Sequence, residues 1–166
     1  MKELIFVRHA KSDWGNESLK DIDRHLNERG YDSAYVLSQW FASKKNKPDL
    51  ILSSTATRAV STALIFTRAM DFNMERFKLD ARIYETTWEK LLKLVQETDD
   101  AAESVMVFGH NPAITNICNE LSTELYFDNI PTCGVISLRF EVNSWKQLEP
   151  KKGKLNFYEY PKNIMD

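Results

Sequence analysis

Short apolar runs alternate along the chain with stretches whose apolar residues recur at helical spacing. A continuous apolar run bounded by polar residues is typical of a strand that is buried on both faces of a sheet. We predict strands at 4–7, 49–53, 104–108 and 134–140, with a shorter strand at 77–79. The last strand is expected to be partly exposed, because polar residues alternate with its apolar ones. Strands that alternate with helices predict an α/β sandwich around a mostly parallel sheet.

Residues that cap helices mark where the helices between these strands begin. Asn27 is of the N-cap type, and the apolar residues after it keep helical spacing up to a break at 44–48. The further predicted caps are Ser54 or Thr55, then Thr86 in a capping box with Glu89, then Asn111 with Pro112 at the first helical position. Residues 143–166 are weakly patterned, and the pattern does not assign elements or a role to them.

The composition restricts the classes of function. The length of 166 residues fits one domain, so residues 1–166 are expected to fold together. Lys and Arg number 22 and Asp and Glu number 24, which gives a formal net charge of −2. Because this balance leaves no general basic field, we expect no nucleic acid and no membrane surface as a partner. The 2 cysteines are too few for a disulfide scaffold, and without a C-x-x-C pair a thiolate zinc site is not expected.

The apolar runs also bear on the expected compartment. None approaches the ~18 residues that a membrane-spanning helix needs. The first run, at 4–7, is too short for the apolar region of a signal peptide. We therefore expect a cytoplasmic protein, in which Cys118 and Cys133 remain reduced thiols.

Reactive side chains follow four of the predicted strands. Arg8 and His9 follow the first strand, Arg58 follows the second, Glu85 follows the strand at 77–79, and His110 follows the strand at 104–108. In parallel α/β sheets, ligands bind beyond the carboxyl ends of the strands. Because these ends meet at one edge of the sheet, we expect the reactive side chains to lie close together.

This set of side chains suits phosphoryl transfer through a phosphohistidine. The planar fork of arginine matches phosphate oxygens, and helix N-termini near Arg58 and His110 add positive dipole ends. Neutral imidazole is a competent nucleophile, and neighbouring arginines disfavour protonation of His9. A carboxyl group nearby can protonate a leaving oxygen. The set supplies its own positive charge, so we expect no metal and no other cofactor.

Four blocks of the sequence, at 4–14, 23–30, 53–63 and 108–112, resemble the motifs of a known family. They are similar to those of the histidine phosphatase superfamily, which has the phosphoglycerate-mutase-like fold, and they occur in the family's order. Ala10 stands where the family motif Arg-His-Gly usually has its glycine. Together with the short length, Arg-His-Ala and Gly-His-Asn-Pro are most similar to the SixA-like phosphohistidine phosphatases.

The resemblance implies a three-layer α/β/α sandwich and assigns roles to the site residues. It implies that His9 is the phosphorylated nucleophile and that Arg8, Arg58 and His110 form the phosphate pocket. Glu85 lies where larger members carry their general acid, and the alternative is a carboxylate that is favoured at a helix start. Ser12 is a candidate for binding a phosphate oxygen through its hydroxyl or backbone, and the alternative is a loop cap.

The predicted activity is that of a metal-independent phosphatase, a phosphoric monoester hydrolase that works through a covalent phosphohistidine on His9. The expected substrate and partner is a phosphohistidine-bearing signalling protein. One alternative is a phosphatase of a small phosphorylated metabolite. Another is a non-catalytic module that binds phosphate or a phosphoprotein. The presence of His9 together with both arginines and His110 argues against the module, because a binder does not need a nucleophile.

Overall fold

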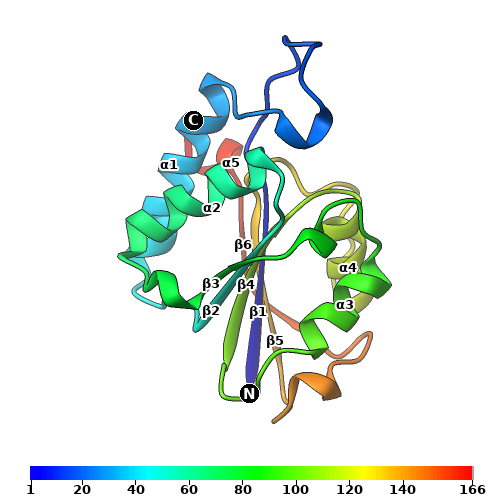
Figure 1. The fold of residues 1–166 in the computed structure, drawn as a ribbon. Coiled ribbons are helices and arrows are strands. Elements are labelled where there is room, and N and C mark those ends of the chain that lie inside the picture. Colours follow the sequence, from blue (N-terminus) through cyan, green and yellow to red (C-terminus); the bar gives the residue numbers. More distant parts are fainter. Residues whose placement is uncertain (166) are drawn as a thin grey trace.

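The computed structural model describes residues 1–165, which form a six-stranded sheet with helices on both faces (Figure 1). The strand order is β3-β2-β4-β1-β5-β6. The strands are β1 (Lys2–Arg8), β2 (Leu50–Ser53), β3 (Phe77–Leu79), β4 (Ser104–Gly109), β5 (Val135–Phe140) and β6 (Lys154–Glu159). The first four in this order are parallel, and β5 is antiparallel to both β1 and β6. The predicted α/β sandwich with a mostly parallel sheet is therefore confirmed.

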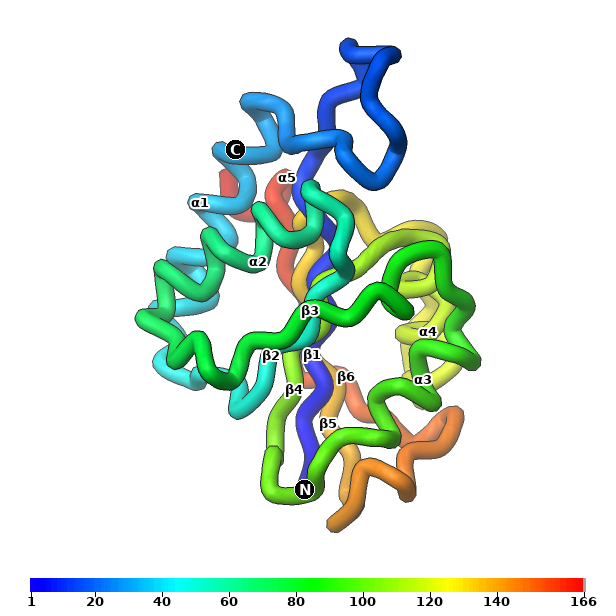
Figure 2. Tube along the Cα trace, in the orientation of Figure 1, coloured from blue at the N-terminus to red at the C-terminus, as the bar shows by residue number. Residues whose placement is uncertain are grey.

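Two layers of helices enclose the sheet. The helices are α1 (Glu28–Ser43), α2 (Thr57–Met70), α3 (Trp88–Gln96), α4 (Ala113–Leu121) and α5 (Pro161–Met165). Short 3-10 helices lie at η1 (Asp21–Asp23), η2 (Met74–Arg76), η3 (Ala81–Ile83) and η4 (Trp145–Gln147). In Figures 1 and 2, α1, α2 and α5 cover one face, and α3 and α4 cover the other. Within the described residues, no helix has both the length and the apolar character to cross a membrane.

The central strand β1 shows why its apolar residues are contiguous. Leu4 and Phe6 pack into the core under α3 and α4, whereas Ile5 and Val7 pack into the core under α1 and α2. Successive side chains of a strand point to opposite faces, so a strand between two helical layers needs apolar residues at every position. The same clusters bury Cys118 and Cys133, and burial raises the pKa of both thiols.

The register of the sheet brings the carboxyl ends of three strands to one level. Arg8 at the end of β1 pairs with Gly109 at the end of β4, and Ser53 at the end of β2 pairs with Phe108. The residues that come next therefore leave the sheet together. The backbone N–H of His9 donates to the carbonyl of Gly109 over 3.0 Å, which fixes the start of the loop after β1. That loop, at residues 11–26, projects beyond the sheet edge (Figure 2).

One prediction about the end of the chain needs correction, and the segment that was left unassigned is structured. The strand at 134–140 is not partly exposed along its length, because β5 lies between β1 and β6 and only Arg139 in β5 is exposed. Residues 143–166, to which the weak pattern assigned no element, include η4, β6 and α5. β6 is an edge strand whose side chains are half-buried or exposed, and this explains its weak hydrophobic pattern.

The helix starts agree with the predicted caps in one case and differ by one or two residues in the others. Asn27 caps α1, and its side chain accepts from the backbone N–H of Gly30. The other N-caps are Ala56 for α2, Thr87 for α3 and Pro112 for α4. Ser54 and Asn111 precede these caps, and each accepts from a backbone N–H at the start of its helix: Ser54 Oγ from Ala56 and Asn111 Oδ1 from Thr115.

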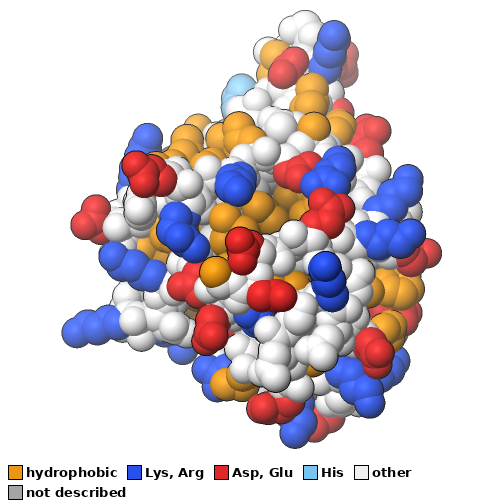
Figure 3. Space-filling model, turned by 60° about the horizontal axis from the view of Figure 1, so that its bottom comes forward, with side chains coloured by type: hydrophobic (Ala, Val, Ile, Leu, Met, Phe, Trp, Pro, Cys, Tyr) orange, Lys and Arg blue, Asp and Glu red, His pale blue; other side chains and the backbone are white. Residues whose placement is uncertain are grey.

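The surface agrees with the balanced composition. On the face shown in Figure 3, acidic and basic side chains are interspersed, without a broad field of one sign.

Candidate active site

A cavity of about 510 Å³ lies at the carboxyl edge of the sheet. It is lined by Arg8, His9, Ser12, Arg58 and His110, which come from the loops and helices that follow β1, β2 and β4. The structure therefore brings together five of the six residues that sequence analysis singled out. Glu85 is not among the residues that line this cavity.

His9 is buried and neutral. Its Nδ1 lies 2.7 Å from the carbonyl oxygen of Ala10. Because a carbonyl can only accept, Nδ1 carries the ring proton and Nε2 keeps its lone pair. The pKa of His9 is lowered to about 3, by burial first and then by His110, Arg58 and Arg8, against the opposing effect of the Ala10 carbonyl. Sequence analysis attributed the neutral state to the arginines, whereas burial makes the larger contribution.

His110 is held beside His9 by a hydroxyl. The two imidazole rings are 5.2 Å apart between centroids, and His110 Nε2 lies 2.8 Å from Ser54 Oγ. Ser54 Oγ accepts from the backbone N–H of Ala56, so its own proton can be donated to Nε2, which leaves the ring proton of His110 on Nδ1. Burial first, and then Arg58, lowers the pKa of His110 to about 4, so this ring is also neutral near pH 7.

The two arginines enter the cavity from different elements. Arg8 ends β1, and its Nη1 donates to the carbonyl of Ile130 over 2.9 Å. Arg58 lies in the first turn of α2 and is only 5% exposed. Thr62, one turn later, accepts from the backbone N–H of Ala10 and donates to the carbonyl of Arg58. The threonine thereby fastens the residue after His9 to the helix that carries Arg58.

Asp21 in η1 is a site residue that sequence analysis missed. Its carbonyl accepts from Arg58 Nη1 over 2.7 Å, and its carboxylate accepts from Arg58 Nη2 over 3.0 Å. The same carboxylate accepts from the hydroxyl of Tyr84 over 2.5 Å and from Arg24 Nε over 3.1 Å. The Tyr84 hydroxyl first, and then the two arginines, holds the pKa of Asp21 well below its usual range. This carboxylate therefore stays charged and anchors Arg58.

Ser12 and Arg24 belong to the projecting loop and form one wall of the cavity. The guanidinium of Arg24 lies over the ring of Trp14, 3.4 Å from its centroid, and Arg24 Nη1 donates to Ser12 Oγ. Because a guanidinium only donates, the Ser12 hydroxyl keeps its proton for another acceptor. The geometry is compatible with the predicted contact of Ser12 to a phosphate oxygen.

The block that carries Arg24 ends in Gly30, and the backbone that packs against this position explains why a glycine stands there. A Cβ at this position would lie 2.0 Å from the carbonyl oxygen of Lys11, which is a backbone clash. The loop after His9 can therefore pack against the first turn of α1 only where the helix has no side chain.

Glu85 differs from its predicted place. It is exposed, and its φ of 52° lies in the left-handed region that favours glycine. Its carboxylate acts on the neighbouring side chain: burial first, and then the carboxylates of Asp21 and Glu85, raises the pKa of Tyr84 to about 12. The helix that follows begins one residue later than predicted, since Thr87 rather than Thr86 is its cap.

Comparisons with known proteins show the family to which this chain belongs. The profile of the family described as histidine phosphatase superfamily (branch 1) matches residues 4–113. An uncharacterised chloroplastic protein of Arabidopsis thaliana is 32% identical over 155 residues, which cover 88% of this chain and 70% of that protein.

Two solved structures share the fold over nearly the whole chain. SixA from Agrobacterium tumefaciens superposes with a TM-score of 0.80 at 26% identity, covering 96% of this chain and 98% of that chain. The protein histidine phosphatase SixA in complex with tungstate gives a TM-score of 0.82 at 18% identity, covering 98% of this chain and 99% of that chain. The chain therefore belongs to the histidine phosphatase superfamily, as its sequence motifs predicted, and its profile match places it in branch 1.

Proposed function

We propose that this protein is a metal-independent phosphatase that forms a covalent phosphohistidine on His9 and dephosphorylates phosphohistidine protein. In this proposal residues 1–166 act as one histidine-phosphatase-like domain. One observation carries the proposal. Among residues 1–165, the buried side-chain nitrogen and oxygen atoms without a hydrogen-bond partner are Arg8 Nε, Arg58 Nε and His110 Nδ1.

These three nitrogen atoms belong to residues that line one cavity together with His9. A buried polar group without a partner costs about 1–3 kcal/mol, so an accumulation at one place calls for an explanation. All three can act as donors, and a phosphoryl group offers oxygens that only accept. The arrangement suits a phosphoryl group held next to the lone pair of a neutral histidine.

The proposed reaction has two steps. His9 Nε2 attacks phosphorus, and the bond between phosphorus and the leaving group breaks, while Arg8, Arg58 and His110 hold the phosphoryl oxygens. The imidazole of the substrate leaves with the electron pair of that bond and takes a proton from water. Water then attacks the phosphorus on His9, which releases inorganic phosphate and restores the neutral imidazole.

The acid–base character of the cavity supports phosphohistidine as the substrate. The residues that line it include neither Asp nor Glu. His110, with its pKa of about 4, is neutral near pH 7 and so is not an imidazolium that could act as a general acid. An alkoxide leaving group depends on a general acid, whose contribution is roughly 10²–10⁴-fold. A leaving imidazole is far less dependent on one. This difference favours phosphohistidine over the alkyl phosphate of a small metabolite.

A substrate panel tests the proposal. We expect kcat/KM to be highest for phosphohistidine protein, lower for phosphotyrosine and lowest for sugar phosphates. His9→Ala should abolish turnover of all three, whereas the matched variant His25→Ala, at an exposed position outside the cavity lining, should retain it. A preference for sugar phosphates would indicate a metabolite phosphatase, and phosphate binding without any turnover would indicate a binding module.

A further inference from the structure

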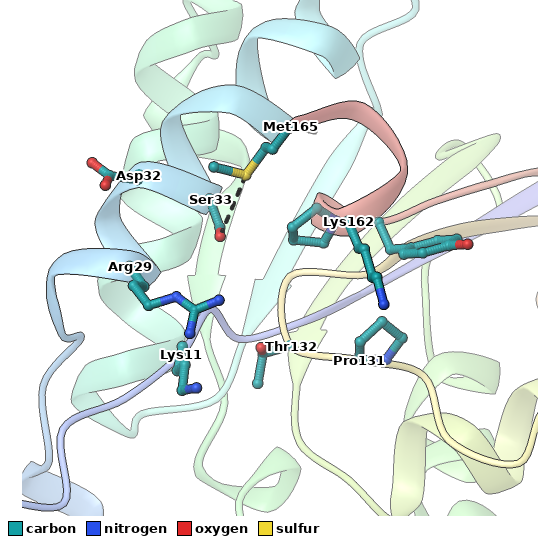
Figure 4. A pocket seen from close by; sticks show the side chains of 10 residues that line it. Lys11, Arg29, Asp32, Ser33, Pro131, Thr132, Lys162 and Met165 are labelled. Atoms are coloured by element: carbon teal, nitrogen blue, oxygen red, sulfur yellow. Dashed lines mark hydrogen bonds between the residues drawn. The ribbon is translucent and has the colours of Figure 1, made fainter.

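A second hollow adjoins the candidate active site. It has a volume of about 540 Å³ and lies between the first turns of α1, the segment before β5 and helix α5 (Figure 4). Lys11, Pro131 and Thr132 line both this hollow and the cavity that contains His9. The two spaces therefore adjoin each other along these three residues. We call this second space the basic groove.

The basic groove takes its charge from three separate parts of the chain. Lys11 comes from the loop after β1, Arg29 from the first turn of α1, and Lys162 from α5. All three are exposed, and none forms an ion pair or a side-chain hydrogen bond within residues 1–165. This contrasts with Arg24 and Arg58, which are paired with Asp21.

The carboxylate of the groove does not offset these cations. Figure 4 shows Arg29 extending from one side toward Thr132 and Lys162 extending from the other side toward Pro131, whereas Asp32 points away from that space. Helix α5 is held against α1 by contacts that include a hydrogen bond from Ser33 Oγ to Met165 Sδ over 3.7 Å. The wall that carries Lys162 is thus positioned relative to the wall that carries Arg29.

We propose that the basic groove binds an acidic segment of the substrate polypeptide, next to the phosphorylated side chain that enters the cavity of His9. The proposal rests on the proposed function for its catalytic step and adds the recognition of the surrounding chain. Three cations that have no partner among residues 1–165, spread along a groove, complement carboxylates on a peptide. Pro131, Tyr160 and Met165 supply apolar surface for the aliphatic parts of such side chains.

The size of the two spaces favours a polypeptide over a small metabolite. A drug-sized ligand fills a pocket of roughly 300–1,000 Å³. The catalytic cavity at about 510 Å³ is already large enough for such a ligand, and the basic groove at about 540 Å³ doubles the space. In the proposal, a segment of chain that passes Thr132 occupies both.

Paired phosphopeptides test this inference. Each pair carries the same phosphorylated residue with either Glu or Gln at the flanking positions, and one set is made with phosphohistidine and a second set with phosphotyrosine. We expect wild type to prefer the Glu peptide in kcat/KM by at least roughly fivefold at low salt, and the preference should shrink as salt screens the charges. The double variant Arg29→Glu/Lys162→Glu should abolish or invert this ratio.

Two further variants make the result specific. Arg29→Gln/Lys162→Gln removes the charges without reversing them and should bring the ratio close to one. Lys90→Glu/Lys93→Glu makes the same charge change at exposed positions of α3, on the other face of the sheet, and should keep the wild-type ratio. A wild-type ratio of one, or a preference that persists in both groove variants, would overturn the proposal.

The two phosphorylated residues separate this proposal from the proposed function. If phosphohistidine peptides are hydrolysed without a preference for Glu, the basic groove proposal fails and the proposed function stands. If only phosphotyrosine peptides are hydrolysed but the preference depends on Arg29 and Lys162, the proposed function fails and the groove proposal stands. If hydrolysis of a small bisphosphorylated substrate depends on Arg29 and Lys162 and hydrolysis of the peptides does not, the groove binds a small anion and the proposal is wrong.

Discussion

Acid should destabilise this protein through the two histidines that support its proposed chemistry. The pKa of His9 is about 3 and that of His110 is about 4 in the folded state, both below the ordinary value of 6.5. Below pH 6.5 the unfolded chain binds protons at these positions and the folded chain does not. Stability therefore falls as the pH falls from 6.5 toward the folded pKa values, and it is unaffected by these groups at pH 7.5.

The size of the effect follows from these pKa values. At pH 5.0 each histidine lies about 1.5 units below its unfolded pKa, which corresponds to about 2 kcal/mol of lost stability per histidine and about 4 kcal/mol for both. The carboxyls with lowered pKa, Asp21, Asp80 and Asp100, contribute little here, because their ordinary value of 3.8 is already below pH 5.0.

Urea unfolding in phosphate-free buffer at pH 7.5 and pH 5.0 measures this difference directly. We expect the free energy of unfolding of wild type to drop by about 4 kcal/mol between the two pH values, and that of His9→Gln to drop by about 2 kcal/mol. His25→Gln, at an exposed position, should behave as wild type. An equal drop in wild type and His9→Gln would refute the assignment of a buried neutral imidazole at position 9.

Three further predictions concern catalysis. Asp21→Asn removes the charge that anchors Arg58 and should lower kcat/KM by about tenfold, as expected for the loss of a charge-assisted hydrogen bond. Asp23→Asn, in the same 3-10 helix, should leave kcat/KM unchanged. Equal effects of the two substitutions would show that Asp21 has no special role in the site. Activity should survive excess EDTA, and a loss that added Mg²⁺, Mn²⁺ or Zn²⁺ restores would contradict the metal-independent mechanism. Glu85→Gln should reduce kcat for alkyl phosphate, p-nitrophenyl phosphate and phosphohistidine by the same small factor, because Glu85 lies outside the cavity lining. A loss of roughly 10²-fold or more confined to alkyl phosphate would reinstate Glu85 as the general acid.

The sequence was most informative at the central strands, because a strand that is covered on both faces requires a run of contiguous apolar residues. Because β1 is covered on both faces, its apolar run marks a central strand, and the residue after it must emerge at the ligand-binding edge. The positions of Arg8, His9 and His110 could be predicted for this reason. The edge strand β6 could not, because its side chains are half-buried or exposed and leave little hydrophobic pattern.

Asp21 could not be identified from its sequence neighbourhood because its partners are brought to it by the fold. Arg58 lies 37 residues away and Tyr84 lies 63 residues away. Only the spacing from Asp21 to Arg24 is local, and that pair alone is also typical of a solvated loop. Glu85 was placed at the cavity on the strength of its position after β3, but η3 and the left-handed backbone at Glu85 intervene between that strand and α3.

The basic groove could not be predicted from the sequence for a related reason. Lys11, Arg29 and Lys162 are ordinary surface cations in the sequence, and only the packing of α5 against α1 places them around one space. Lys162 falls in the weakly patterned region for which no element was predicted.

The central claim is that His9 carries the phosphoryl group during turnover. Wild type and His9→Ala should be mixed with ³²P-labelled phosphohistidine protein, quenched in base within the first turnover, digested and analysed by mass spectrometry. We predict base-stable, acid-labile phosphate on the peptide that contains His9 in wild type, and none in His9→Ala. Label on His110 or on any other residue, or turnover that continues in His9→Ala, would contradict the account.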